Sequence, residues 1–301
     1  MTVIVPVFNS QTWLDDCLSS VLSQTGVSLE VLCIDDGSTD QSRRVLQRFA
    51  ERDPRVHVVT QANSGQSVAR NVGLDAARGR YVIFLDSDDF WPIDGLRELV
   101  ERADRDCLDV LLFDGVAFRD GAVADDIWSR YCRYYVRAAA YRRPRCGPRI
   151  VADMRQREDY RAHVGLYLAR LAATRAAEVR FIPGIVHQDN PYTFALLLSA
   201  KRVAHVRTYF YARRLRPGST ITALQDAASA RGYVVSYMAM RRVMDRTDLD
   251  DASVAGANAV LGGVYEAARA RISRLPESAW QELKQLDSSP DAQAILDEIR
   301  G

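Results

Sequence analysis

The chain has 301 residues, of which 48% are hydrophobic and 26% are charged, as in a globular protein with a substantial core. Its formal net charge of +1 gives no overall field for nucleic acid, so we expect no nucleic-acid partner. No run approaches the roughly 18 apolar residues of a membrane span, and five scattered cysteines favour reduced thiols over a disulfide framework. The chain enters an apolar strand without a basic, apolar leader, so we expect a cytoplasmic protein.

Strand and helix patterns alternate over residues 2–113. Apolar runs predict strands, and amphipathic runs between them predict helices. The expected strands cover residues 2–7, 29–34, 56–59, 81–85 and 110–113, and the expected helices cover residues 13–22, 40–50, 66–77 and 93–105. Regular alternation with short connections predicts an α/β fold with a Rossmann-like, mainly parallel sheet flanked by helices. Residues 222–301 show helical patterns, so we expect a helical C-terminal extension.

An acidic cluster at residues 86–89 directly follows the fourth expected strand. The carboxyl ends of parallel strands open into the crevice where such folds bind ligands. Asp86 and Asp88 are two residues apart, so a turn can aim both carboxylates at one centre. Their oxygens suit a hard divalent cation such as Mg²⁺ or Mn²⁺, which in turn would hold a diphosphate. The alternative is an acidic turn that caps the next helix.

Polar loops follow the first three expected strands at the same edge of the sheet. Phe8 can stack on a flat base, which is worth roughly 1–3 kcal/mol, or it can be a core residue. Asp36 can accept a hydrogen bond from a base or ribose, or it can cap a helix. Residues 63–73 place a polar loop before a helix N-terminus, a natural anion and ribose site, although Arg70 can equally pair with a surface acid. This arrangement predicts a nucleotide crevice, and the absence of G-x-G-x-x-G after the first strand disfavours a dehydrogenase-type fold.

Four ordered motifs resemble those of the family-2 glycosyltransferases with the GT-A fold. They are residues 4–9, 31–40, 63–73 and 81–89, and the resemblance continues more weakly through residues 181–190 and 209–222. The resemblance implies an inverting transfer of a sugar from a nucleotide donor, usually a uridine diphosphate (UDP) sugar, with Mn²⁺ or Mg²⁺. The acceptor would be a glycan or lipid-linked molecule in bacterial polysaccharide or glycoconjugate synthesis.

The resemblance also implies roles for individual residues on the donor side. Phe8 and Asp36 would hold the uracil. Asn71 and Asp86 would lie near the ribose and the donor sugar. Asp88 would be the metal carboxylate, with Asp86 as a further candidate ligand. The other donor-side candidates are Pro6, Asn9, Gly65, Arg70, Ser87, Arg213 and Arg216.

On the acceptor side, Asp189 matches the general base of the family. Gln188 stands where the family usually has Glu, so it keeps the side-chain shape and loses a charge. His187 is an acceptor-side residue and a third candidate metal ligand, although a lone His is more often structural. Arg213 and Arg216 lie in a segment resembling the mobile loop of the family, where guanidinium groups can grip diphosphate oxygens or remain solvated. Inversion needs one base for the acceptor hydroxyl and a cation for the leaving diphosphate.

One stretch, residues 128–149, is left unexplained by the resemblance. It contains seven arginines, four tyrosines, one tryptophan and no acid. Arg130, Arg133 and Arg137 are expected to share a helix face, which would dock on anionic lipid headgroups or a phosphate-bearing acceptor. A solvated face packed through its tyrosines is the alternative.

We therefore expect residues 1–115 to bind the nucleotide sugar, residues 116–222 to supply the acceptor side, and residues 223–301 to form the extension. One rival hypothesis is a non-catalytic nucleotide-sugar or glycan-binding module in which Gln188 marks lost chemistry. Another is a sugar-nucleotide pyrophosphorylase. That class normally carries a glycine-rich, basic signature after the first strand, and residues 6–10 lack it.

Overall fold

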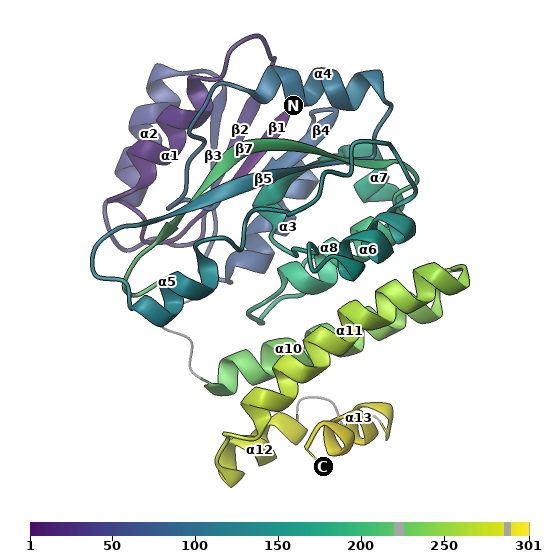
Figure 1. The fold of residues 1–301 in the computed structure, drawn as a ribbon. Helices are drawn as coiled ribbons and strands as arrows, with labels where there is room; N and C mark the ends of the chain where they lie inside the picture. Colours follow the sequence, from purple (N-terminus) through teal and green to yellow (C-terminus); the bar gives the residue numbers. More distant parts are fainter. Residues whose placement is uncertain (220–225, 286–289, 301) are drawn as a thin grey trace.

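The computed structural model describes residues 1–219, 226–285 and 290–300. Within this part of the chain, seven strands form one sheet in the order β3-β2-β1-β4-β6-β5-β7. The strands are β1 (Thr2–Val7), β2 (Glu30–Asp35), β3 (Val56–Thr60), β4 (Tyr81–Phe84), β5 (Val110–Arg119), β6 (Tyr167–Arg170) and β7 (Val203–Leu215). Neighbouring strands are parallel except where β6 pairs with β4 and β5. The expected mainly parallel, helix-flanked sheet is confirmed (Figure 1).

Helices cover both faces of this sheet because successive side chains of a strand point to opposite sides. The helices of the first half are α1 (Leu14–Leu22), α2 (Ser42–Arg52), α3 (Gln66–Ala76) and α4 (Leu96–Arg105). Val3 and Val5 of β1 belong to a core with α1, α2 and α4. Ile4, between them, belongs to a second core with α3. The parallel strands β1, β2, β3 and β4 therefore end at one edge of the sheet. The helices α1, α2, α3 and α4 follow them in the chain.

The second half adds strands on the far side of β4. The strand expected at residues 110–113 continues to Arg119 as β5, and the short strand β6 lies between β5 and β4. β5 pairs with β7 from Val110 to Arg119. The expected boundary at residue 115 thus falls inside β5, and strands on both sides of it share one sheet. The division into residues 1–115 and 116–222 describes expected roles within one folding unit, and it remains a proposal.

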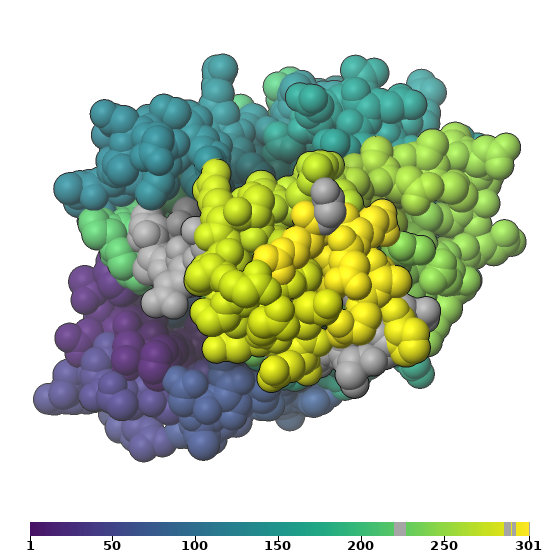
Figure 2. Space-filling model, turned by 90° about the horizontal axis from the view of Figure 1, so that it is seen from below, coloured from purple at the N-terminus to yellow at the C-terminus, as the bar shows by residue number. Residues whose placement is uncertain are grey.

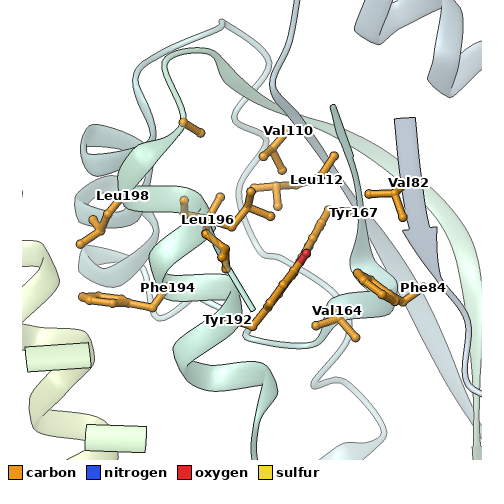
Figure 3. Close-up of a cluster of buried hydrophobic side chains, with 14 of the residues drawn as sticks. Val82, Phe84, Val110, Leu112, Val164, Tyr167, Tyr192, Phe194, Leu196 and Leu198 are labelled. Atoms are coloured by element: carbon orange, nitrogen blue, oxygen red, sulfur yellow. The ribbon is translucent and has the colours of Figure 1, made fainter. Parts of the chain in front are cut away.

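Aromatic packing beneath the sheet fixes the start of α8 (Asp189–Ser199) (Figure 3). Tyr192 stacks on Phe181 with ring centroids 3.8 Å apart. Phe84 of β4 meets Tyr192 edge-on at 5.7 Å. Pairs of this kind contribute about 0.5–1.5 kcal/mol beyond the area they bury. This core therefore holds Asp189, the first residue of α8, close to the end of β4.

The arginine-rich stretch folds differently from the expectation. The connecting elements here are α5 (Asp125–Tyr131), α6 (Gly147–Gln156), the 3-10 turn η1 (Val164–Leu166) and α7 (Leu171–Ala176). α5 ends before Arg133, and Arg137 is fully buried, where its Nη1 donates to the Phe113 carbonyl at 2.7 Å and lies 3.3 Å from Asp114 Oδ1. The expected helix face shared by Arg130, Arg133 and Arg137 is therefore wrong. A buried carboxylate needs a counter-charge, and Arg137 of this stretch supplies it to Asp114.

The expected helical extension is confirmed for the residues that the structure describes. It consists of α10 (Asp226–Asp245), α11 (Asp251–Ile272), α12 (Glu277–Lys284) and α13 (Pro290–Arg300). α10 and α11 pack against α8 and α6 below the sheet (Figure 1), while parts of α10 and α11 join α12 and α13 in a separate small core. No helix in the described ranges is both long and apolar enough to cross a bilayer.

Candidate active site

A cavity of about 430 Å³ opens at the carboxyl ends of β1, β2 and β4, beside the starts of α3 and α8. We call it the donor cavity. Most of the residues singled out from the sequence line it, although they are scattered along the chain. They are Pro6, Phe8, Asp36, Gly65, Arg70, Asp86, Ser87, Asp88, His187, Gln188, Asp189, Arg213 and Arg216.

Asn9 and Asn71 do not line this cavity. Asn9 Oδ1 accepts a hydrogen bond from the Thr39 amide at 2.8 Å and so holds the loop after β2. Asn71 pairs twice with the backbone of Phe181, donating to its carbonyl at 2.8 Å and accepting from its amide at 3.0 Å. Both side chains therefore hold loops beside the cavity, and their expected contact with the donor stays a prediction.

Phe8 and Asp36, the residues expected to hold the nucleobase, both line the cavity. Phe8 is 47% exposed, which excludes the alternative that it is a core residue and leaves its ring open for stacking. Asp36 is 3% exposed, and its carboxylate accepts from the amides of Ser64 and Gly65, each at 2.8 Å. Gly65 has φ +88°, a conformation that favours glycine. Asp36 thus shapes the loop before α3, and helix capping, the alternative reading, is not its role.

The acidic cluster is held by arginines from two distant elements. Asp86 pairs with Arg70 of α3 at 2.7 Å and with Arg213 of β7 at 2.8 Å. Burial alone would raise the pKa of Asp86, but the two guanidinium groups hold it well below its ordinary value. Arg70 pairs with an acid of the cavity and not with a surface acid. A permanently charged carboxylate at this position can attract a cation or a sugar hydroxyl.

Asp89, which the sequence analysis did not single out, anchors β7 to this cluster. It is fully buried, and it accepts from the Arg214 amide at 2.7 Å, from Arg213 at 2.7 Å and from the Tyr211 hydroxyl. Burial raises the pKa of Asp89 to about 7, with Asp88 and Asp86 adding to the rise and Arg213 opposing it. The side chain therefore has its partners within the protein and fixes where Arg213 lies.

The donor set fits a divalent cation. Asp86, Asp89 and His163 bring potential ligand atoms within 4.8 Å of one another. Asp88, beside them in the chain, lines the cavity and pairs with Arg216 at 3.0 Å. Burial lowers the pKa of His163 to about 3, so the ring is neutral, which is the form that binds metals. Carboxylate oxygens with one neutral imidazole are chemically suited to Mn²⁺ or Mg²⁺.

His163 was missed from the sequence, and His187 takes a different role. His163 lies just before η1, outside every motif, and its Nδ1 accepts from the Gly165 amide at 3.0 Å. His187 Nε2 is 2.9 Å from Ser229 Oγ, and its ring stacks on Tyr233 at 4.0 Å. The His187 ring is thus engaged by two residues of α10 in the helical extension. His163 takes its place among the candidate metal ligands.

The candidate base, Asp189, also lines the cavity. Asp189 is half-buried and is the first residue of α8, so its carboxylate lies at the N-terminus of this helix. Burial raises the pKa of Asp189 to about 6; Arg70 opposes the rise and Asp86 adds to it. A carboxylate with this pKa is ionised at neutral pH and is more basic than an ordinary Asp. It therefore matches the requirement for a general base better than a solvated carboxylate does.

Comparison with known proteins agrees with this geometry. The family model described as "Glycosyl transferase family 2" matches residues 2–153, just over half of the chain. The chain belongs to glycosyl transferase family 2.

Several curated relatives of this family-2 protein carry glycosyltransferase names. EpsJ of Bacillus subtilis is 29% identical over 222 residues, which are 73% of this chain and 62% of EpsJ. GlyA of Streptococcus pneumoniae is 28% identical over 79% of this chain and 35% of GlyA. YibD of Escherichia coli is 28% identical over 82% of this chain and 70% of YibD. The chain thus spans less than two thirds of the length of EpsJ and GlyA.

Solved structures show the same fold. Residues 1–349 of TarS from S. aureus, in complex with UDP-GlcNAc, align with a TM-score of 0.67 at 20% identity, covering 99% of this chain and 78% of that one. The mannosyltransferase PcManGT from Pyrobaculum calidifontis, in complex with GDP-Man and Mn²⁺, aligns with a TM-score of 0.58 at 17% identity over 99% and 78% of the two chains. The family-2 chain therefore has the GT-A fold.

An amide pair links the base side of this family-2 site to the acidic cluster. Gln188 Nε2 donates to Gln66 Oε1 at 2.7 Å, and Gln66 Nε2 donates to Asp86 Oδ1 at 3.2 Å. A carboxylate at position 188 would place an acceptor against the Gln66 oxygen, with no hydrogen to share. The amide at Gln188 thus completes a chain of donors that a Glu would interrupt.

We expect Gln188→Glu to move the acidic limb of the pH–rate profile upward by about one pH unit, because a new negative charge next to Asp189 disfavours ionisation of the base. The base works in its ionised form, so activity is present above its pKa of about 6 and is lost as pH falls through that value. The variant should be slower than wild type near pH 6 and similar at pH 8. Gln188→Met, which removes the amide without adding charge, should leave the limb in place. An unmoved limb in Gln188→Glu would contradict this account.

Proposed function

We propose that the protein transfers a sugar from a UDP-sugar to an acceptor hydroxyl, with inversion and with Mn²⁺ or Mg²⁺. The observation that carries this proposal is the donor cavity, where Phe8 and Asp36, the acidic cluster and the raised-pKa carboxylate of Asp189 meet. Family membership supports it, as do the nucleotide sugars named for related folds: UDP-GlcNAc for TarS and GDP-Man for PcManGT.

Each part of the cavity has a role in this reaction. We propose Asp88, which lines the cavity, as the metal carboxylate, and we propose Asp86 and His163 as further ligands, from the group of potential ligand atoms that also contains Asp89. The cation would neutralise charge on the leaving diphosphate. Asp189 takes the proton of the acceptor hydroxyl. The hydroxyl oxygen then forms a bond to the anomeric carbon on the face opposite the diphosphate, and the bond from that carbon to the diphosphate oxygen breaks, releasing UDP.

The rival hypotheses are less consistent with the site. A pyrophosphorylase is not favoured by a match to glycosyl transferase family 2. A binding-only module is not favoured, because the chain belongs to a family whose curated relatives carry glycosyltransferase names. Gln188, which suggested lost chemistry, is accounted for by its hydrogen bond to Gln66.

A thermal-shift screen of the full chain tests the proposal. UDP with Mn²⁺ should raise the melting temperature by several degrees, because a ligand at 100 times its Kd adds about 2.7 kcal/mol to the free energy of unfolding. UDP without a cation, and adenosine diphosphate with Mn²⁺, should give much smaller shifts. No shift with any nucleotide would overturn the proposal. Binding of UDP-sugars without any turnover would select the binding-only module.

We further propose that the acceptor is a glycan or lipid-linked molecule of bacterial polysaccharide synthesis, and that residues 1–115 serve the donor and residues 116–222 serve the acceptor. The residues around 222 lie outside the described ranges. The base Asp189 comes from the second part, and Phe8, Asp36 and Asp88 come from the first. This distribution supports the division by role for these four residues, whereas His163, Arg213 and Arg216, which also line the donor cavity, come from the second part.

We also propose a cytoplasmic protein that contacts the anionic inner face of the plasma membrane. Arg130 and Arg133 are exposed, as are Arg142 and Arg143 nearby. Sedimentation with anionic liposomes should show weak binding that disappears at 1 M salt, where the Debye length falls to about 3 Å. Changing Arg130 and Arg133 to Gln should remove part of this binding, whereas Arg137 is excluded from the test because it is buried with Asp114. Wild-type protein that stays in the supernatant at low salt would contradict this membrane contact.

A further inference from the structure

A second cleft, of about 520 Å³, adjoins the donor cavity. Gly65, Gln66 and Gln188 line both spaces, so the hydrogen-bonded pair Gln66–Gln188 stands at their junction. The other walls come from the loop at residues 184–186 and from α10 and α12. Figure 2 shows these C-terminal helices across the centre of the lower face, with the N-terminal half of the chain along one side. The cleft therefore lies between the helical extension and the loop that carries the base.

The walls of this cleft are mainly apolar. The apolar side chains come from the base loop, from both helices and from Leu275, which precedes α12. The main contributors are Ile185, Val186, Ala228, Leu275, Ala279 and Leu283. Arg231 and Glu282 are its two charged residues, and no aromatic ring contributes to it among the residues described. Sugar hydroxyls need polar partners when they leave water, whereas an apolar group gains roughly 0.8 kcal/mol for each CH₂ that is buried. Hydrocarbon is thus a better match for these walls than a bare sugar.

Apolar space continues beyond Leu283. A further cavity of about 370 Å³ shares this residue and is lined by Ile182, Val234, Met238 and Leu296. Leu283 therefore forms part of the wall of both spaces, and the second is lined mainly by apolar side chains together with Arg242.

The wall of the cleft and the base loop are held by the same contacts. His187 has φ +61° and is bound to Ser229 and stacked on Tyr233, both of α10. A Cβ at Gly232 would lie 2.4 Å from the Val186 carbonyl oxygen, so α10 approaches this loop as closely as glycine allows. Anything seated in the cleft is therefore placed by the residues that also place Asp189.

We propose that this cleft binds the apolar aglycone of an amphipathic acceptor, whose sugar hydroxyl reaches Asp189 past Gln66 and Gln188. The proposal rests on the proposed glycosyl transfer for the acceptor role, and on the cleft itself for the class of ligand. It selects a lipid-linked acceptor over a free glycan.

Binding of two glucosides to the full chain tests this inference without any donor. Isothermal titration should show that n-octyl β-D-glucopyranoside, kept below its micelle concentration, binds at least about tenfold more tightly than methyl β-D-glucopyranoside, because of its buried methylenes. Ala228→Trp and Ala279→Trp fill the cleft from α10 and α12, and each should weaken octyl glucoside at least about tenfold. Both variants should keep wild-type affinity for UDP with Mn²⁺, which shows that they fold. The matched control, Ala270→Trp at an exposed position of α11 outside the cleft, should bind like wild type.

Two results would overturn the inference. Equal affinity for the two glucosides would show that the site does not select hydrocarbon. Octyl glucoside binding that survives both Ala228→Trp and Ala279→Trp would show that the ligand lies elsewhere. If UDP with Mn²⁺ binds and the octyl glucoside does not, the inference fails and the proposed function stands. If the octyl glucoside binds in the cleft and no nucleotide binds the chain, the acceptor role is overturned together with the proposed function.

Discussion

Asp189→Asn is expected to slow sugar transfer by at least about 100-fold, the scale of lost general-base catalysis, and to leave donor affinity nearly unchanged. The amide keeps the shape of the side chain at the start of α8 but cannot take the acceptor proton. The wild-type carboxylate does so at neutral pH because its pKa of about 6 leaves it mostly ionised there. Steady-state turnover and calorimetric titration with UDP and Mn²⁺ measure the two quantities separately.

The matched control for this change is Asp297→Asn, because Asp297 is an exposed carboxylate of α13 whose partner is Lys284. It should leave both quantities at their wild-type values. Wild-type turnover in Asp189→Asn would show that another group is the base. A parallel loss of donor affinity would show that Asp189 acts mainly in binding.

Asp88→Ala should abolish the response of UDP binding to Mn²⁺, with at least about a tenfold loss of affinity, since even partners of metal ligands are worth 10- to 100-fold. The carboxylate lines the donor cavity and now pairs with Arg216, which also lies over the Trp13 ring at 3.8 Å. That ring contact remains in the variant, but the pair is mostly buried, so the free energy of unfolding should fall by about 1–3 kcal/mol. Titration of UDP with and without Mn²⁺, together with urea unfolding, gives both values.

The two histidines near the cavity sharpen this test. His163→Ala should weaken the Mn²⁺ response, because His163 lies with Asp86 and Asp89 in one group of potential ligand atoms. His187→Ala should leave the response intact, because His187 is engaged with Ser229. Unchanged affinity and cation response in Asp88→Ala would remove Asp88 from the metal site. The opposite ranking of the histidines would restore the assignment made from the sequence.

The strand ends were predictable because their signals are local. The apolar run at residues 81–85 and the acidic residues after it encode a strand and its edge within nine residues. Parallel pairing then requires that such ends meet on one side of the sheet, and the structure confirms that Phe8, Asp36 and Asp88 share one cavity.

Other features depend on contacts that no local pattern records. His163 carries no motif, and it reaches the acidic cluster only because β6 inserts between β4 and β5. Arg137 looks like its exposed neighbours in sequence, but Asp114, 23 residues earlier, draws it into the core. The Asn71 amide can form hydrogen bonds with a ribose or with a backbone peptide group. Its hydrogen bond to the Phe181 carbonyl, 110 residues later in the chain, is not recorded by any local pattern.

The contacts of α10 with His187 limit how segments of this protein can be exchanged with those of other family members. Among the residues that the structure describes, those lining the donor cavity all precede position 220, so that part resembles a self-sufficient cassette. Yet Ser229, Tyr233 and the close approach at Gly232 set the loop two residues before the base. A chimera that joins this cassette to the C-terminal helices of another protein would keep the donor motifs. Its loop before Asp189 would lose the contacts with α10 that position the base. Swaps that keep residues 226–240 with the cassette would avoid that mismatch.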